Sequence, residues 1–242
     1  MTTLGDTLFQ VVRREPSLVT YWRLNEVAGS PYAYDYGARY NINALLNGGP
    51  VPGPALVQDD PAAGSYVFGG GGVNAEALDI SPLRVVGDIS LEAWIVPYAA
   101  GLTDNIVVKM NSAGSIAAPY VLGLVDGYPR LLLGDGTAQV EAAGIVAPIA
   151  GIPSHVVATS FRGAMTVYLN GSSIGTASLG SQAVADAGQP VYVGNGFNGL
   201  VGEVALYSGA LSAARVLKHF NVGQQVLLDP GHYRMIDPPS YS

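Results

Sequence analysis

Acidic side chains are the groups in this sequence that could support catalysis, and their spacing argues against it. Two carboxyl groups that cleave a glycosidic bond with retention must lie about 5 Å apart, and only alternating positions of a strand share a face. Glu76 and Asp79 are three residues apart and would face opposite sides of a strand. Glu92, Glu141 and Glu203 each stand alone. The spacing therefore predicts that the chain is not an enzyme.

Two glycine motifs and the histidines lead to the same expectation. The sequence GSSIG at 171–175 has the spacing of a nucleophile elbow, but that motif requires a strand-to-helix turn and here follows an Asn-Gly hairpin signal. The sequence GNGFNG at 194–199 has dinucleotide-binding spacing, but an extended run follows it instead of a helix. His155, His219 and His232 lie in unrelated segments, so each is expected to be structural or on the surface.

Tyrosines crowd one short segment. Tyr32, Tyr34, Tyr36 and Tyr40 fall within it, in a chain with 14 Tyr and 5 Phe. Tyrosine combines an apolar ring with a hydrogen-bonding tip, and alternating positions of an extended chain share one face. Two roles are predicted for the segment. It binds a sugar, or it packs over the edge of a β-sandwich or against a neighbouring subunit.

The composition excludes several classes of function. Charged residues make up 12% of the chain, and 11 Lys and Arg against 18 Asp and Glu give a net charge of −7. A surface that binds nucleic acid needs clustered basic residues, so no nucleic-acid partner is expected. Cysteine is absent, which excludes disulfides and thiolate zinc sites.

Two segments bear on export and on membranes. Residues 1–6 do not begin a basic region followed by an apolar one, so no secretory signal is expected. The weakly polar run 142–152 contains Gly144, Pro148 and Gly151 and is too short to span a bilayer. No membrane insertion is therefore expected.

Apolar spacing predicts one helix followed by many short strands. Residues 4–14 place Leu4, Leu8 and Val11 at helical spacing, and Pro16 ends the pattern. Beyond residue 17, short runs rich in Val, Ile, Leu and Tyr alternate with turn residues, which is typical of a sandwich or barrel. The predicted strands are 19–24, 65–68, 89–96, 106–110, 120–125, 130–133, 138–142, 155–160, 165–169, 191–194 and 202–207.

The turns and the C-terminal region complete this outline. The pairs Asn170-Gly171 and Asp126-Gly127 favour type I′ hairpins, because these residues tolerate positive φ. A helix is predicted over 211–220, with a serine cap, an apolar stripe and a glycine stop. Those residues are Ser212 for the cap, Val216, Leu217 and Phe220 for the stripe, and Gly223 for the stop.

Five motifs occur in a fixed order along the chain. They are LVTYWRLNE at 18–26, DYGARYNIN at 35–43, ISLEAWI at 89–95, MTVYLNG at 165–171 and FNGLVGEVALY at 197–207. In this order they resemble the laminin-G-like jelly-roll domains of the concanavalin A-like lectin and glucanase superfamily. The resemblance implies an all-β antiparallel jelly-roll sandwich over 18–223, after an N-terminal helical extension (1–17) and before an extended C-terminal arm (224–242).

The resemblance also implies one structural calcium ion, with no other cofactor. Relatives often hold it with an Asp in the early loop and acidic groups at the closing strand, positions that Asp35 and Glu203 match. A second closing Asp is replaced here by Gly202. The alternative is that Asp35 only stabilises a turn.

Three functions are compatible with the resemblance. Few charges, no cysteine, a leaderless start and flanking extensions favour a virion structural protein, a phage tail or capsid decoration component. Its partners would be other virion proteins in a homo-oligomeric or multi-copy assembly, and a host cell-surface glycan. The alternative is a carbohydrate-binding module of a cell-surface or secreted, extracellular protein. A glycoside hydrolase ranks third.

Overall fold

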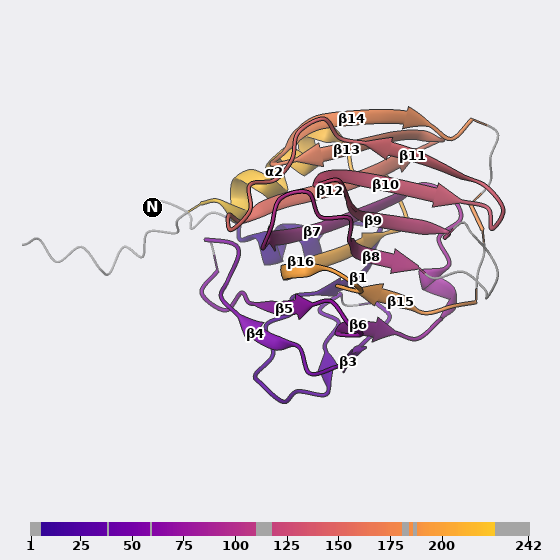
Figure 1. The fold of residues 1–242 in the computed structure, drawn as a ribbon. Helices are drawn as coiled ribbons and strands as arrows, with labels where there is room; N and C mark the ends of the chain where they lie inside the picture. Colours follow the sequence, from indigo (N-terminus) through magenta and orange to yellow (C-terminus); the bar gives the residue numbers. More distant parts are fainter. Residues whose placement is uncertain are drawn as a thin grey trace, which may run out of the picture.

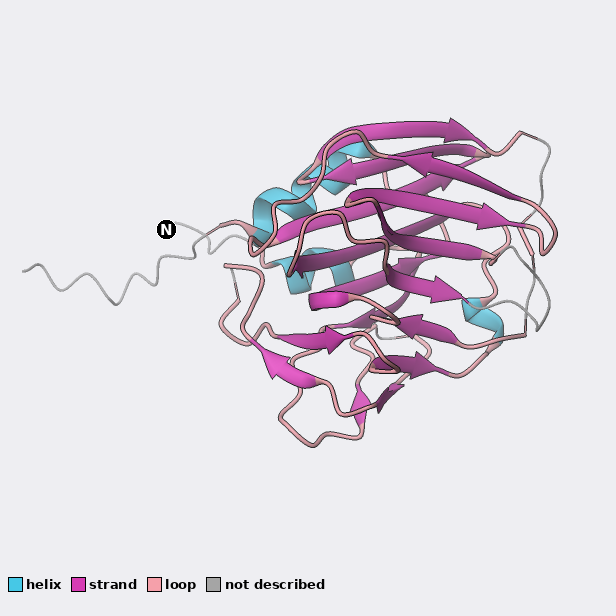
Figure 2. Cartoon of the chain, viewed as in Figure 1, coloured by secondary structure: helices cyan, strands magenta, loops and turns pink. Residues whose placement is uncertain are grey.

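Two antiparallel sheets packed face to face form the molecule, with two α-helices against one of them (Figures 1 and 2). The computed structural model describes residues 6–37, 39–58, 60–109, 118–180, 184–185 and 188–225. The predicted all-β sandwich with a short helix near each end is confirmed. Most of the predicted arm, residues 226–242 with His232, lies outside the described residues.

The two sheets differ in what lies against their outer faces. The covered sheet carries helices α1 (Leu8–Arg13) and α2 (Ala213–Gly223); its strands, in spatial order, are β14 (Ser172–Ser178), β13 (Ala164–Leu169), β12 (Ser154–Phe161), β7 (Ile89–Pro97), β16 (Asn198–Tyr207), β5 (Ser65–Gly69) and β4 (Val51–Gly53), with β1 (Leu18–Trp22) also paired to β16. The open sheet has the order β11 (Gln139–Ala143), β10 (Tyr128–Gly134), β9 (Tyr120–Val125), β8 (Asn105–Lys109), β15 (Val191–Val193), β6 (Asn74–Ala77), β3 (Ala44–Asn47) and β2 (Tyr32–Ala33). A 3₁₀ turn, η1 (Ser81–Leu83), follows β6.

The main core lies between the sheets and follows the two-residue period of the strands. On β10, Leu131 and Leu133 point into this core, whereas Leu132 belongs to a small cluster on the outer face of the open sheet. Trp22 is fully enclosed, and its indole N–H donates a hydrogen bond to the carbonyl of Ile42 at 2.6 Å. A register slip of one residue would turn these apolar side chains outward, so the pairing is strongly specified.

The covered sheet is buried on both faces. All nine residues of β7 are buried, because α1 and α2 close the outer face of this sheet (Figure 2). Leu8, Val11 and Val12 of α1 pack there with Val216 of α2 and Trp94 of β7. Strands enclosed on both sides have nearly continuous apolar sequences, and on β7 only Ser90 and Glu92 interrupt the apolar run.

Both predicted hairpin turns are confirmed. Asn170 and Gly171 have φ values of 51° and 78°, and Asp126 and Gly127 have 50° and 86°. These positive angles at both central residues are those that a type I′ turn requires. The turns join β13 to β14 and β9 to β10.

Helix α2 differs from its prediction in two details. Ser212 caps it as expected, accepting a hydrogen bond from the Arg215 amide at 3.4 Å. Gly223, however, is a helical residue and does not stop the helix; a Cβ there would lie 2.6 Å from Cζ2 of Trp94. Leu217, predicted for the apolar stripe, is 45% exposed, and His219 faces the sheet instead.

Four short strands were not predicted: β2, β3, β4 and β6. They are two to four residues long and contain Ala, Asn, Gly and Pro, which have weak strand propensity. Their pairing comes from the neighbouring strands, not from their own sequences. Among the described residues, no helix is long and apolar enough to cross a bilayer.

A buried carboxylate, Glu92 of β7, joins the helices to the covered sheet. Its side chain accepts hydrogen bonds from His155 Nε2 at 2.7 Å, from His219 Nδ1 at 3.1 Å and from the Tyr207 hydroxyl. His219 belongs to α2, and its Nε2 lies 3.2 Å from Glu15, just after α1. Glu92, which stood alone in the sequence, is therefore the centre of a network that connects both helices to the sheet.

Opposite charges shift the pKa values of this network. Burial favours the neutral forms, but the charge and hydrogen bonds of His219 and His155 hold the pKa of Glu92 well below its usual range. The pKa of His219 rises to about 9 despite burial, because Glu92 and Glu15 stabilise its charged form. A raised His pKa contributes stability that is complete below about 6.5 and is lost as the pH rises through the folded-state value.

Replacing Glu92 with Gln should lower the free energy of unfolding by about 3–5 kcal/mol, the usual cost of removing one partner of a buried ion pair. The wild-type Tm should fall between pH 7 and the pKa of His219 at about 9, and this fall should be smaller in the variant. Circular dichroism melts across that range measure both effects. Glu141→Gln, in the exposed pair with Arg130, is the control and should change little. Equal effects of the two substitutions would contradict this role of Glu92.

Candidate functional site

Three hollows open along residues 32–43, and each is bordered by one of the predicted tyrosines. The Tyr32 hollow has a volume of about 290 Å³, the Tyr36 hollow about 380 Å³ and the Tyr40 hollow about 320 Å³. Tyr34 is exposed and lines none of the three. The structure therefore distributes the four tyrosines over separate surroundings and does not place them on one face.

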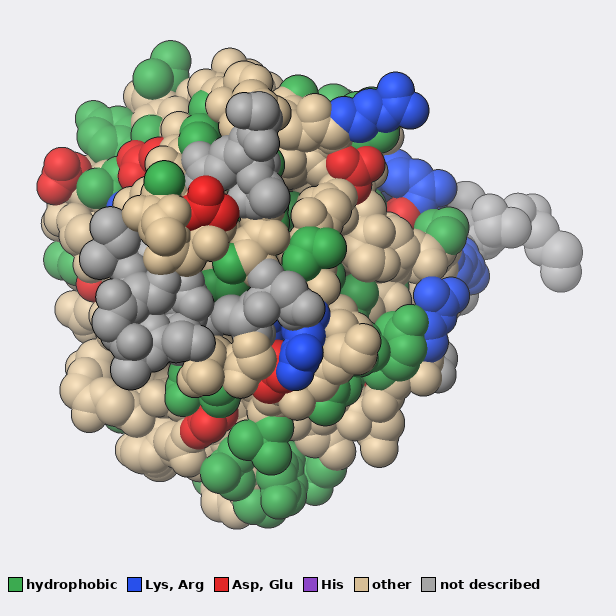
Figure 3. Space-filling view, turned by 90° about the vertical axis from the view of Figure 1, so that its right-hand side faces the viewer, with side chains coloured by type: hydrophobic (Ala, Val, Ile, Leu, Met, Phe, Trp, Pro, Cys, Tyr) green, Lys and Arg blue, Asp and Glu red, His purple; other side chains and the backbone are tan. Residues whose placement is uncertain are grey.

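The Tyr32 hollow lies on the outer face of the open sheet, at its β2–β3–β6 edge. Tyr32 pairs with Leu45, and Leu45 pairs with Glu76, so these three side chains stand in one row across neighbouring strands. Hydrophobic side chains gather at the lower edge of Figure 3, the side on which Figure 1 places β3. The residues that line this hollow are Tyr32, Asn41, Ile42, Asn43, Leu45, Glu76, Leu78 and Ile80.

Glu76 is the charged residue of the Tyr32 hollow, and its neighbours hold it in place. Asn47 donates a hydrogen bond to its carboxylate at 2.9 Å. Tyr192, on the adjacent β15, is hydrogen-bonded to the same carboxylate. Burial and the charge of Glu76 raise the pKa of Tyr192, so its phenol remains protonated and donates. The hollow thus combines an exposed ring, apolar walls, amides and one oriented carboxylate.

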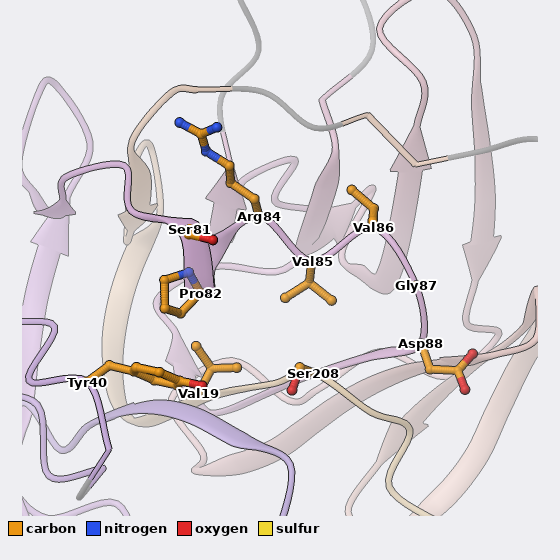
Figure 4. Close-up of a pocket in the computed structure, with 10 residues that line it drawn as sticks. All are labelled: Val19, Tyr40, Ser81, Pro82, Arg84, Val85, Val86, Gly87, Asp88 and Ser208. Carbon is orange, nitrogen blue, oxygen red and sulfur yellow. The ribbon is translucent and has the colours of Figure 1, made fainter.

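The other two hollows are less suited to hold a ligand. Tyr36 packs edge-on against Phe9 of α1, with ring centroids 6.0 Å apart, and so follows the packing alternative. Figure 4 shows the Tyr40 hollow: Val85 points into it, whereas the charged ends of Arg84 and Asp88 point away from its middle. Arg84 is paired with Asp79, so its charge already has a partner.

Asp35 organises the loop that carries the asparagines of the Tyr32 hollow. Its Oδ1 accepts hydrogen bonds from the amides of Tyr21 at 2.9 Å and Gly37 at 2.7 Å, and its Oδ2 accepts from Ile42 at 2.8 Å. The Asp35 amide in turn donates to Asn43 Oδ1 at 2.9 Å. This pattern is the turn-stabilising alternative considered for Asp35.

Glu203 is buried below α1, in a bulge of β16. Its φ of 50° turns the side chain away from the regular register, toward Tyr21 and Arg23. The Tyr21 hydroxyl and the Arg23 guanidinium, at 3.1–3.2 Å, donate to its carboxylate. Burial raises the pKa of Glu203 to about 7, although Arg23 partly opposes the shift.

Asp35 and Glu203 do not form a calcium site together in this structure. Asp35 accepts a hydrogen bond from the main-chain amide of Tyr21, whereas Glu203 accepts one from the phenol at the other end of the same residue. Calcium takes six to eight oxygen ligands, yet within the described ranges no cluster of three or more His, Asp or Glu could hold a metal. Protein donors already occupy both carboxylates, so these residues do not fit the ion.

Sequence reasoning identified Tyr32 but missed most of its hollow. Glu76 was considered only as a failed partner of Asp79. On β6, Ala75 and Ala77 point into the core, so Glu76 between them must point outward. That alternation indicates the direction of Glu76 only once residues 74–77 are known to form a strand. The position of Asn41 in the lining of the Tyr32 hollow could not be predicted from the sequence, because it depends on the hydrogen bonds of Asp35.

Comparison with known families identifies the class of this protein. Residues 68–217 match the model of the concanavalin A-like lectin/glucanases superfamily. The match covers more than half of the chain, which therefore belongs to this family. No curated protein matches the sequence.

Solved structures share the fold at low sequence identity. The binding domain of Paraclostridial Mosquitocidal Protein 1 has a TM-score of 0.65 at 16% identity, over 85% of this chain and 52% of that one. The binding domain of botulinum neurotoxin DC, solved with SialylT, has a TM-score of 0.67 at 11% identity, over 88% of this chain and 52% of that one. Domain 4 of AbnA, a GH43 extracellular arabinanase from Geobacillus stearothermophilus solved with arabinotriose, has a TM-score of 0.59 at 16% identity, over 86% and 98%.

The three structural matches differ in the share of the other chain that is covered. The chain spans about half the length of the two toxin domains but nearly all of the AbnA domain. Identities this low show the fold alone. None of the three is a virion protein, so the expected phage origin gains no support from them.

Calcium should leave the stability of the chain unchanged, because both candidate carboxylates have protein donors. An ion bound specifically to the native state would stabilise it by about 2.7 kcal/mol at 100 times its Kd. Thermal unfolding with excess calcium and with EDTA measures this. A rise in Tm with calcium that is lost in Asp35→Asn would show that the ion does bind there.

Proposed function

We propose that this chain is a non-catalytic carbohydrate-binding module and that the Tyr32 hollow receives the sugar. One observation carries the proposal. An exposed tyrosine ring, the Glu76 carboxylate and the Asn41 amide meet in one hollow, on the uncovered face of a lectin-like sandwich. Ligand sites combine apolar walls with a few converging polar groups in this way. The arabinotriose bound by domain 4 of AbnA supports the same class of ligand.

The chemistry of the hollow favours a neutral saccharide. The ring of Tyr32 offers an apolar surface for the C–H face of a sugar, and Leu45 and Leu78 extend that surface. Glu76 and Asn41 supply hydrogen-bonding groups for hydroxyls. Because Glu76 is the charged residue of the lining, a carboxylated or sulfated sugar would meet repulsion there.

The placement of carboxylates supports a binding function without hydrolysis. Within the strands of the open sheet, the acidic residues are Glu76 on β6 and Glu141 on β11. Four strands lie between them, so they stand five strand spacings apart, or about 24 Å. Glycosidase pairs lie about 5–9.5 Å apart. We therefore propose a role in carbohydrate recognition, and we propose a cell surface or the outside of the cell as its location.

The virion role remains a weaker proposal. It rests on the low charge and on the predicted arm, whose residues 226–242 are not described. The sugar-binding proposal rests instead on a described hollow and on a family match.

Tyr32→Ala should weaken the binding of a neutral oligosaccharide about tenfold or more, because it removes the stacking surface. Glu76→Gln should weaken it to a similar extent, since hydrogen bonds to a charged group contribute about 1.5–3 kcal/mol. A glycan array that includes arabinotriose would identify ligands, and titration calorimetry would then measure the Kd of each variant.

Tyr40→Ala is the matched control for this experiment. Tyr40 has nearly the same exposure as Tyr32, 43% against 42%, but lines a different hollow. It should leave the Kd unchanged. Loss of binding in Tyr40→Ala alone would move the site to the Tyr40 hollow, and silence of the wild-type chain across the array would refute the carbohydrate proposal.

A further inference from the structure

The loop that joins β11 to β12, residues 144–152, exposes an unusual number of aliphatic side chains. We call it the apolar loop. Ile145 is 82% exposed and Ile149 66% exposed, and Val146 and Ile152 are each about half exposed. Exposed apolar residues are ordinary when scattered, but a contiguous group marks an interaction site.

The apolar loop is held firmly at both of its ends. The Gly144 amide donates to the Pro129 carbonyl at 2.8 Å, and the Ile145 amide donates to Ile174 at 3.0 Å. At the other end, the Gly151 amide donates to the Pro97 carbonyl at 2.8 Å. These bonds join the loop to β10, β14 and β7, so its aliphatic side chains project from a fixed base.

Two tyrosines flank this base. Tyr128 precedes Pro129 and Tyr98 follows Pro97, the two prolines that anchor the loop. Both tyrosines are exposed, at 41% and 49%. An aliphatic tip with tyrosines behind it has the order of side chains found at a membrane–water interface, where aromatic rings lie at headgroup level.

The apolar loop contains no charged residue, and the turns beside it contribute acidic residues. Residues 142–154 contain no Asp, Glu, Lys, Arg or His. The neighbouring turns contribute Asp104 and Asp126, and the nearby Arg130 is paired with Glu141 at 3.3 Å. Nothing in this arrangement attracts an anionic surface, and the net charge of −7 opposes one.

We propose that the apolar loop inserts into the interface of a lipid bilayer with zwitterionic headgroups, a property independent of the proposed sugar binding. Its aliphatic residues, at positions 145, 146, 149 and 152, are distributed along the whole loop. A protein partner would cover one side of such a projecting loop, whereas lipid surrounds it on all sides. A second copy of this chain would likewise cover only one side of the loop.

The depth of insertion is limited by the backbone of the loop. Irregular backbone cannot enter the hydrocarbon core, because its polar groups would lose their hydrogen bonds. The loop therefore reaches only the boundary between headgroups and acyl chains, about 5–10 Å deep. The run 142–152 is too short to span a bilayer, but entry into one leaflet needs no such length.

Flotation of the full chain with phosphatidylcholine vesicles that lack glycolipid tests the proposal. The wild-type chain should float with the vesicles, and Ile145→Ser with Ile149→Ser should reduce the partition coefficient about a hundredfold, or tenfold for each residue. The matched control removes two exposed aliphatics elsewhere, Val27→Ser with Val51→Ser, and should not alter it. Unchanged melting curves would show that the variants fold.

A fluorescent variant separates insertion from surface adhesion. Trp22 and Trp94 are fully buried, so in Ile149→Trp the new indole reports on the loop. Its emission should shift to shorter wavelength with vesicles, and lipids brominated near the headgroup should quench it. Binding that requires anionic lipid and disappears in salt would overturn the proposal. So would wild-type dimerisation that the serine variant abolishes without any vesicle binding.

Discussion

The structure depends on neutralising one negative charge inside the protein. Glu92 lies at the centre of the covered sheet, where an unpaired carboxylate would be too costly to bury. His155 from the adjacent strand and His219 from α2 supply its partners, and Glu15 connects the same network to α1. The helices can therefore close this face only in the arrangement that satisfies Glu92. Apolar packing alone would tolerate other positions of such short helices.

Because α1 and α2 cover one sheet, the two proposed binding surfaces lie on the other sheet and on a loop. The outer face of the covered sheet is filled by α1, α2 and the residues packed beneath them. The Tyr32 hollow lies on the open sheet, and the apolar loop lies beyond its opposite edge strand, β11. The Tyr32 hollow and the start of the apolar loop thus lie at opposite edges of the open sheet, and the loop continues from there to β12 of the covered sheet.

Much of the fold could be predicted from local signals. The Asn170-Gly171 turn, the Ser212 cap and the long apolar strands each depend on residues close in sequence. The short strands at the β2–β3–β6 edge could not be predicted, because their partners supply the reason for their extended shape. The same difference explains why Glu92 seemed isolated: its histidines lie 63 and 127 residues away.

The candidate site was predictable only in part, for the same physical reason. A crowded run of tyrosines pointed to the right segment, but their alternation implied one shared face. Asp35 gathers three main-chain amides and so bends the segment, which sends Tyr32 and Tyr36 to different sides. Local periodicity holds only while the chain stays extended.

The placement of the two helices has a consequence for how such a module can be used. Helix α1 lies near the start of the described chain and α2 near its end, and the two contact each other on the covered sheet (Figure 1). Both ends of the described chain therefore lie on the side of the covered sheet, opposite the outer face that carries the Tyr32 hollow. The sandwich can be inserted into, or tethered to, a larger architecture with its open sheet facing outward.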